Sequence, residues 1–127
     1  MTISPFLSVA LGGALGASLR YGIGLWALRI WGGSFPVGVV GVNILGSFLM
    51  GIAVIALNRL GVPQWQPFVM TGILGGFTTF SAFSLEAVTL WQQGQDAAAL
   101  GYVVLSVVGS IAGLVAGLWI ARGMMGL

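Results

Sequence analysis

The sequence contains no cysteine, no histidine and no lysine, and its only acidic residues are Glu86 and Asp96. Without cysteine, disulfides, thiolate catalysis and thiolate metal sites are excluded. Without histidine, and with so few carboxylates, a catalytic metal centre is not expected. No pair of a nucleophile and a neighbouring base can be assembled from the remaining residues, so we do not expect an enzyme.

Charge of either sign is scarce. Charged residues make up 5% of the 127 residues, whereas soluble domains carry about 25%. The hydrophobic share is 58%, so lipid is the expected solvent of the chain. The arginines are isolated from one another and form no basic run, which speaks against nucleic acid as a partner. No positive leader precedes the first apolar run, which we interpret as a retained helix.

Long apolar runs dominate what is present. A membrane helix needs about 20 mostly apolar residues, and we expect four such spans, at residues 5–30, 37–57, 68–91 and 97–121. They are joined by a short turn, a longer connection and a polar turn, at residues 31–36, 58–67 and 92–96. Tryptophans fall near the span ends, as is usual at a membrane interface: Trp31, Trp65, Trp91 and Trp119. We therefore predict an all-α membrane protein in which residues 1–127 form a single transmembrane domain.

The arginines give only a weak signal for orientation. With the N-terminus inside, Arg59 and Arg122 lie inside and Arg29 lies outside, so the positive-inside bias is small. A weak bias fits a protein that inserts in both orientations, and it also fits a single orientation with a poor signal. Because four thin helices make little wall around a solvated pathway, an oligomer is the expected assembly.

Glycines recur on one face of the first span and of the fourth. At i, i+4 spacing the first span carries Gly12, Gly16, Arg20 and Gly24, and the fourth carries Gly109, Gly113 and Gly117. Patterns of small residues at this spacing let helix backbones approach closely in membranes. The pattern does not identify which helices approach each other.

Several polar residues are expected at membrane depth, where each is costly and is therefore a functional candidate. Asn43 is interpreted either as a functional donor or as half of an interhelical hydrogen bond. Arg20 is either a functional charge or a side chain that snorkels or caps a helix end. Glu86 lies late in the third span. The fourth span carries either hydroxyls that bond back to their own helix or a polar track, formed by Tyr102, Ser106 and Ser110.

The densest signal lies in the third span, in the segment Gly75-Gly76-Phe77-Thr78-Thr79-Phe80-Ser81-Ala82-Phe83-Ser84. Paired glycines followed by paired threonines are poor helix formers, so they indicate either a break or an intact helix with a packing notch. An unwound segment at mid-membrane is tolerated only where protein buries it or where it lines a cavity. Its carbonyls then face cations and its N–H groups face anions. In a helix Phe80 and Phe83 share one face, either as packing residues or as part of a site.

Three segments resemble the motifs of one family, the small fluoride channels called Fluc or CrcB. They are GGALGASLRY at residues 12–21, VNILGSF at residues 42–48 and GGFTTFSAFS at residues 75–84, and the third match is highly specific. The chain length and the four spans agree with the family as well. Two departures concern the extent of the polar track, since relatives tend to carry threonine where this chain has Val39 and Leu114.

This resemblance implies an antiparallel, dual-topology homodimer with a break in the third helix, two fluoride pores and one central sodium ion. The backbone carbonyls of Gly75 and Thr78 from both subunits would hold the sodium. Arg20 would draw anions toward an aqueous vestibule. The pores would offer amide, hydroxyl and ring-edge donors to fluoride, from Asn43, Phe80, Phe83, Tyr102, Ser106 and Ser110.

The implied function is passive, fluoride-selective efflux across the cell inner (plasma) membrane, which gives fluoride resistance. Fluoride, a second copy of the chain and the lipid bilayer are the implied partners. Two other classes stay open. A small multidrug-type, proton-coupled antiporter needs a membrane-embedded carboxylate, for which Glu86 is the only candidate, and an acid in the first span is absent. A membrane assembly subunit without transport activity needs no such site.

Overall fold

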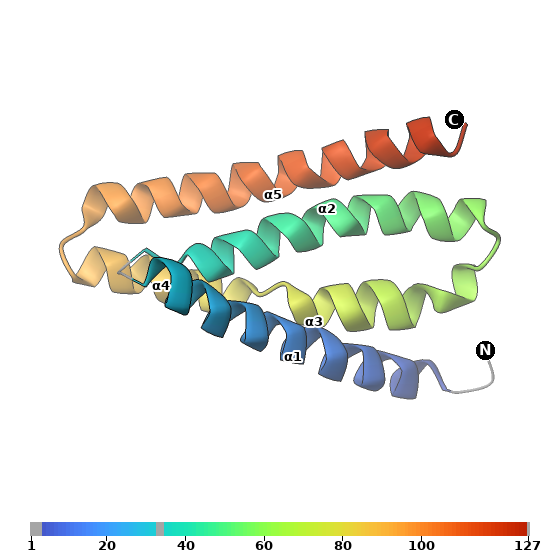
Figure 1. The fold of residues 1–127 in the computed structure, drawn as a ribbon, viewed down its shortest axis with the longest axis horizontal. Helices are drawn as coiled ribbons and strands as arrows, with labels where there is room; N and C mark the ends of the chain where they lie inside the picture. Colours follow the sequence, from blue (N-terminus) through green and yellow to red (C-terminus); the bar gives the residue numbers. More distant parts are fainter. Residues whose placement is uncertain (1–3, 33–34, 127) are drawn as a thin grey trace.

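The chain forms four long helical stretches that run side by side. The computed structural model describes residues 4–32 and 35–126, so the expected turn at 31–36 lies partly outside the described residues, at Gly33 and Ser34. Figure 1 shows the helices lying roughly along one long axis, with short connections at both ends. In the described part of the chain, four stretches are long and apolar enough to cross a membrane, which confirms the all-helical fold.

Three of these stretches are continuous helices, α1 (Pro5–Trp31), α2 (Val37–Arg59) and α5 (Asp96–Met124). The third stretch consists of four shorter segments, η1 (Pro63–Trp65), η2 (Pro67–Leu74), α3 (Gly75–Phe77) and α4 (Phe80–Gln92). The η1 segment is a 3₁₀ turn and η2 is a π-helix. Helix α2 continues beyond the expected end at residue 57, so the connection expected at 58–67 shortens to residues 60–62 before η1.

The glycine stripes lie where helix backbones meet. Helix α1 packs mainly against η2 and α3, and α5 packs mainly against α2. A Cβ atom added at Gly16 would collide with the carbonyl oxygen of Ile73, and one added at Gly117 would collide with that of Phe48. The stripe on α1 therefore marks its contact with the third span, and the stripe on α5 marks its contact with α2.

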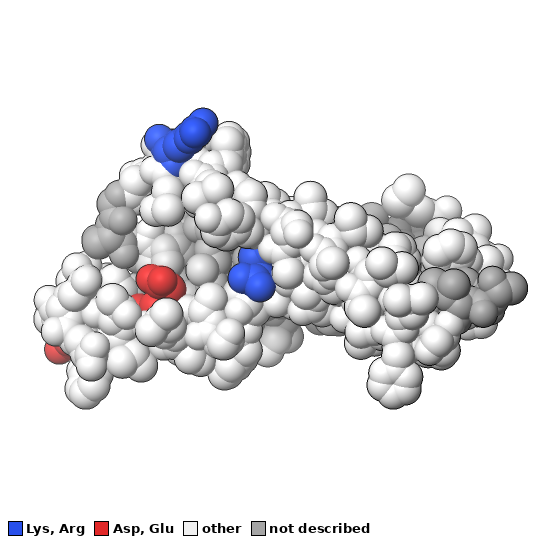
Figure 2. Space-filling view, turned by 90° about the horizontal axis from the view of Figure 1, so that it is seen from below, with Lys and Arg blue, Asp and Glu red and all other residues white. Residues whose placement is uncertain are grey.

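A small core joins α2, α4 and α5. Tyr102 on α5 is fully buried and packs with Val40 of α2 and Leu90 of α4. Many large apolar side chains elsewhere point outward, as expected for helices whose solvent is lipid. Figure 2 shows one such face, on which isolated basic and acidic groups are separated by uncharged surface.

The third span is broken at two adjacent threonines. Thr78 (φ −86°, ψ 157°) and Thr79 (φ −150°, ψ 121°) have extended backbones, so one helix ends at Phe77 and the next begins at Phe80. The expected break is therefore present. The paired glycines, expected to weaken the helix, are helical instead, since Gly75 and Gly76 form α3. They permit close packing, because a Cβ atom at Gly76 would lie 2.8 Å from the carbonyl oxygen of Gly13 on α1.

Candidate functional site

The two threonines of the break make hydrogen bonds to the helix on either side of it, Thr78 as a donor and Thr79 as an acceptor. On the first side, Thr78 donates from its backbone N–H and from its hydroxyl to the carbonyl of Leu74, over 3.1 and 3.0 Å. On the second side, the hydroxyl of Thr79 accepts the N–H of Ala82 at 3.1 Å and caps the start of α4. The first threonine thus ends α3, and the second begins α4.

Asn43 on α2 reaches across to the break. Its Oδ1 accepts the backbone N–H of Thr79 at 2.7 Å, and its Nδ2 donates to the carbonyl of Thr79 at 3.0 Å. The approach of α2 is close, because a Cβ atom at Gly46, one turn further along, would collide with Cγ2 of Thr78. The interhelical hydrogen bond that the sequence left open for Asn43 is therefore present, and its partner is main chain.

A cavity of about 270 Å³ lies beside this contact. Five of the six residues expected in a pore line it: Asn43, Phe80, Phe83, Ser106 and Ser110. The rest of its wall is formed by Thr78, Thr79, Val107 and Ile111. The polar groups that face this cavity from the described residues are amides and hydroxyls, and none of its lining side chains carries a charge.

The two phenylalanines stand together at this cavity. Their ring centroids are 5.3 Å apart and their planes make an angle of 64°, an edge-to-face arrangement. Phe83 is half-buried, whereas the ring of Phe80 is 78% exposed on the single chain. Phe80 therefore lies at the exposed edge of the cavity, where its ring can contact a neighbouring molecule.

Tyr102 lies behind the cavity rather than in its wall. Its ring centroid is 5.4 Å from that of Phe83 and 5.7 Å from that of Phe35. Within the described part of the chain, the buried hydroxyls of Tyr102 and Ser106 have no hydrogen-bond partner. Buried hydroxyls normally have one, and of these two only Ser106 lines the cavity.

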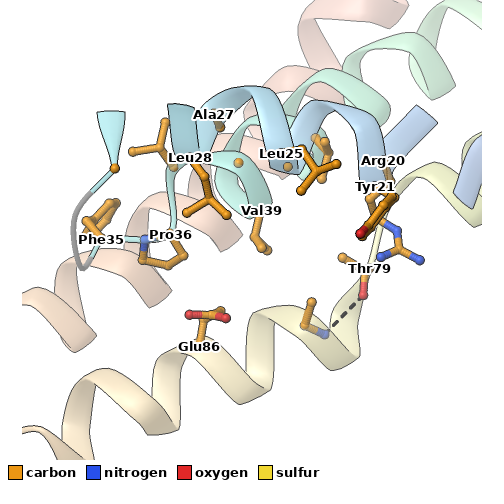
Figure 3. A pocket seen from close by; sticks show the side chains of 16 residues that line it. Arg20, Tyr21, Leu25, Ala27, Leu28, Phe35, Pro36, Val39, Thr79 and Glu86 are labelled. Atoms are coloured by element: carbon orange, nitrogen blue, oxygen red, sulfur yellow. Dashed lines mark hydrogen bonds between the residues drawn. The ribbon is translucent and has the colours of Figure 1, made fainter. Parts of the chain in front are cut away.

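A second cavity, of about 330 Å³, lies between α1, the start of α2 and α4. Figure 3 shows Arg20 and Thr79 toward one end of this cavity, and Glu86 further along α4. Val39, at the position where a threonine was expected from the resemblance, is also in its wall. Arg20 additionally donates from Nε to the carbonyl of Gly76 at 3.2 Å, so it caps the last turn of α3.

Gly75 and Thr78, the residues expected to hold a cation, lie in α3 and in the break. The last carbonyls of a helix have no partner within it. Here the carbonyls of Leu74 and Gly76 accept hydrogen bonds from Thr78 and Arg20. Among the described residues, no hydrogen bond ends on the carbonyl of Gly75 or Thr78. These two oxygens fit a hard cation, which prefers oxygen ligands.

Thr79 was expected only as one of four poor helix formers, and no π-helix was expected at η2. Thr79 is nevertheless the residue that bonds Asn43 and caps α4. A threonine directly before a helical run is a recognised start signal, and this signal was available at Thr79. Pro67 at the first position of η2 indicates the start of a helix, but it does not distinguish a π-helix from an α-helix.

Comparison of the sequence with known proteins places the chain in a family. The family model described as "CrcB-like protein, Camphor Resistance (CrcB)" matches residues 7–118. The "Fluoride-specific ion channel FluC" of Cereibacter sphaeroides is 57% identical over 123 residues, which cover 97% of this chain and 98% of the relative. Proteins of the same name from a Ruegeria species and from Rhizobium meliloti are 58% and 47% identical, over 120 and 125 residues. They cover 94% and 97% of this chain.

The matched region reaches into all four spans and includes the break and both cavities. All three relatives are named as ion channels, in agreement with the expectation that this chain is not an enzyme. On the extent of the family match and the identity of these relatives, the chain belongs to the CrcB family.

Proposed function

We propose that this protein is a fluoride-selective channel through which fluoride leaves the cytoplasm passively. The observation that carries the proposal is the uncharged cavity at the break, where the amide of Asn43, two serine hydroxyls and two phenylalanine rings come together. An anion gives up its water only where other donors replace it, and the edge of an aromatic ring is the positive part of its quadrupole. The names of the relatives support fluoride as the ion.

The lack of a full charge in this cavity suits conduction. A fixed cation would bind a small anion tightly, whereas conduction requires sites weak enough for the ion to leave. Arg20 lies in the other cavity, where one of its N–H groups is already bonded to Gly76. From there it would raise the local anion concentration without standing in the narrow part of the pathway.

A second, antiparallel copy of the chain is the proposed partner, giving a dual-topology homodimer with two pores. On the single chain, the ring of Phe80 is 78% exposed and Gly75 of the interrupted helix lies at the surface. Irregular backbone at membrane depth is tolerated only where protein covers it or where it lines a water-filled cavity. A second copy on this face would cover the break and complete the wall of the cavity. The weak arginine bias is compatible with opposite orientations.

The carbonyls of Gly75 and Thr78 are proposed to hold a structural sodium ion at the centre of this homodimer. A cation there would bind to oxygens that accept no hydrogen bond from the described residues. We expect the purified protein to unfold at a lower temperature when sodium in the buffer is replaced by a bulky organic cation such as N-methyl-D-glucamine. Equal unfolding temperatures in the two buffers would count against the site.

The cell inner membrane is the proposed location, because of the acid–base chemistry of fluoride. Neutral hydrogen fluoride crosses membranes and dissociates in a less acidic cytoplasm, so the anion accumulates there. A passive pathway through the same membrane lets the trapped anion return. Fluoride resistance is the expected benefit to the cell.

Efflux of fluoride from proteoliposomes tests the function. Liposomes loaded with equal concentrations of fluoride and chloride should release fluoride rapidly and retain chloride, as followed by ion-selective electrodes. A proton-coupled antiporter would instead move organic cations along a pH gradient and would depend on Glu86, which lines the other cavity. An assembly subunit would release neither anion.

A further inference from the structure

The two hydrogen bonds between Asn43 and Thr79 form a closed ring. The N–H of Thr79 donates to Oδ1 of Asn43 at 2.7 Å, and the carbonyl of Thr79 accepts from Nδ2 at 3.0 Å. Two residues on neighbouring antiparallel strands exchange hydrogen bonds in the same way. Thr79 has the matching extended backbone, with φ −150° and ψ 121°. The side-chain amide of Asn43 thus takes the place of a partner strand for a single residue.

This ring acts on the residue from which α4 begins. The hydroxyl of Thr79 accepts the N–H of Ala82, and Phe80 is the first residue of the helix. The rings of Phe80 and Phe83 both lie within the first turn of α4 and both line the cavity. Any rotation of the Thr79 backbone would therefore move both rings.

We propose that Asn43 is a positioning residue which, through Thr79, fixes the start of α4 and thereby the two phenylalanine rings. Its significance for fluoride depends on the proposed function, but the ring of hydrogen bonds can be tested without it. A carboxamide has two N–H donors, and one of them is occupied by the carbonyl of Thr79. Only the other is left for an anion in the cavity, so removal of the whole side chain removes two separate contributions.

Two substitutions separate these contributions. Asn43→Leu keeps a similar volume and removes both hydrogen bonds. Asn43→Asp keeps an oxygen that accepts the N–H of Thr79, but its second oxygen replaces the Nδ2 donor, so it repels an anion and also the carbonyl oxygen of Thr79. If Asn43 only contacted the anion, both changes would reduce fluoride efflux and neither would alter the backbone at the break.

Hydrogen exchange of the Thr79 amide, measured on the purified full-length protein, reports the ring directly. In Asn43→Leu we expect this amide to exchange roughly tenfold faster or more, as befits the loss of buried hydrogen bonds. In Asn43→Asp we expect the Thr79 amide to exchange faster than in the unsubstituted protein but more slowly than in Asn43→Leu, because one of the two hydrogen bonds is kept, whereas fluoride efflux falls severely. Asn58→Leu is the matched control, because Asn58 lies on the same helix and donates to Val54 of its own helix.

Unchanged exchange at Thr79 in a correctly sized Asn43→Leu protein would overturn the proposal. If that variant does not fold, exchange at Thr79 in Asn43→Asp that equals that of the unsubstituted protein would overturn it instead. Failure of the proposed function is distinguishable from either result. In that case the unsubstituted protein itself would release no fluoride, whereas the exchange at Thr79 would still respond to Asn43.

Discussion

Phe80 and Phe83 allow packing to be separated from ion contact by a single substitution. If the rings only pack, exchange for isoleucine should cost less than about 1.5 kcal/mol of stability and leave transport near normal. If their edges contact fluoride, isoleucine has no positive edge to offer. We expect Phe80→Ile to cut fluoride efflux severely while the protein keeps its size-exclusion profile. The 78% exposure of this ring on the single chain supports that expectation, because little packing within the chain is at risk.

Methionine at either position is the informative intermediate, since its polarisable thioether and methyl group replace part of the ring's contacts. Its efflux should fall between that of the unsubstituted protein and that of the isoleucine variant. Normal efflux in both Phe80→Ile and Phe83→Ile would show that the rings only pack, and would leave Asn43 as the main ligand.

Gly16 and Gly22 on α1 differ in what a methyl group would meet. At Gly16 a Cβ atom would collide with the carbonyl oxygen of Ile73 and lie 2.9 Å from the backbone nitrogen of Phe77. At Gly22 nothing lies within 4 Å. We expect Gly16→Ala to lower stability by about 1–3 kcal/mol, as overpacking does. Gly22→Ala should be neutral or stabilising by up to about 1 kcal/mol, because alanine is the better helix former.

Thermal unfolding of both variants in detergent measures this difference. A Gly16→Ala protein as stable as the unsubstituted one would mean that α1 and η2 are further apart than the structure places them.

At this scale, the sequence predicted which residue types gather at the cavity but not the bonds they make. Polar and aromatic residues at membrane depth stand out in a chain with 5% charged residues, and their spacing placed Ser106 and Ser110 on one face. The partner of Asn43 could not be predicted, because Thr79 is 36 residues away and meets it only through the packing of α2 on the third span.

Helix α4 is capped at its N-terminus by Thr79. Replacing Thr79 by alanine removes the oxygen that accepts the N–H of Ala82, and loss of such a cap typically costs about 0.5–2 kcal/mol. We expect Thr79→Ala to lower the unfolding temperature of the protein, and Thr79→Ser, which keeps the hydroxyl, to restore most of it. Equal losses in the two variants would assign the effect to the missing methyl group instead of the cap.

The position of the break shows the limit of helix propensity as a guide. Glycine ranks below threonine as a helix former, and the paired glycines and the paired threonines were both expected to weaken the helix. In the structure Gly75 and Gly76 are helical, and the absence of a side chain at Gly76 lets α1 approach. Thr78 and Thr79 leave the helix because their hydroxyls and Asn43 satisfy backbone groups there. The position of the break thus depends on contacts with α1 and α2. The sequence of the third span alone does not reveal these contacts.

For the whole molecule, cysteine labelling tests the dual topology, and the lack of native cysteine removes any background. Gly94, the obvious site between α4 and α5, has φ +77°, a conformation that other residues adopt with strain. Gln93 (φ −80°) and Leu60 (φ −79°) avoid this problem and lie in the connections at opposite ends of the bundle. If the chain inserts in both orientations, Gln93→Cys and Leu60→Cys should each react partly from either side of the membrane.

Complete labelling of each cysteine from one side only, and from opposite sides for the two positions, would instead establish a single orientation. A lysed sample, in which every cysteine is accessible, provides the reference for full reaction.

The four spans were predictable because length and hydropathy alone determine whether a helix crosses a bilayer. The assembly was not predictable from physical pattern, since the weak arginine bias fits one orientation as well as two. The outward position of Phe80 and Gly75 adds a physical reason for a partner. That reason appears only once the third span is folded against α1 and α2.

The interruption of the third span also creates two helix ends in the middle of the molecule. The dipoles of successive peptide units add up along a helix, leaving roughly half a positive charge at its N-terminus and half a negative charge at its C-terminus. The end of α3 therefore carries negative partial charge beside Arg20, and the start of α4 carries positive partial charge beside the cavity of Phe80 and Phe83. Two residues separate these ends. A chain almost without formal charges thus has two helix ends of opposite partial charge side by side, and Arg20 already compensates the negative end at α3.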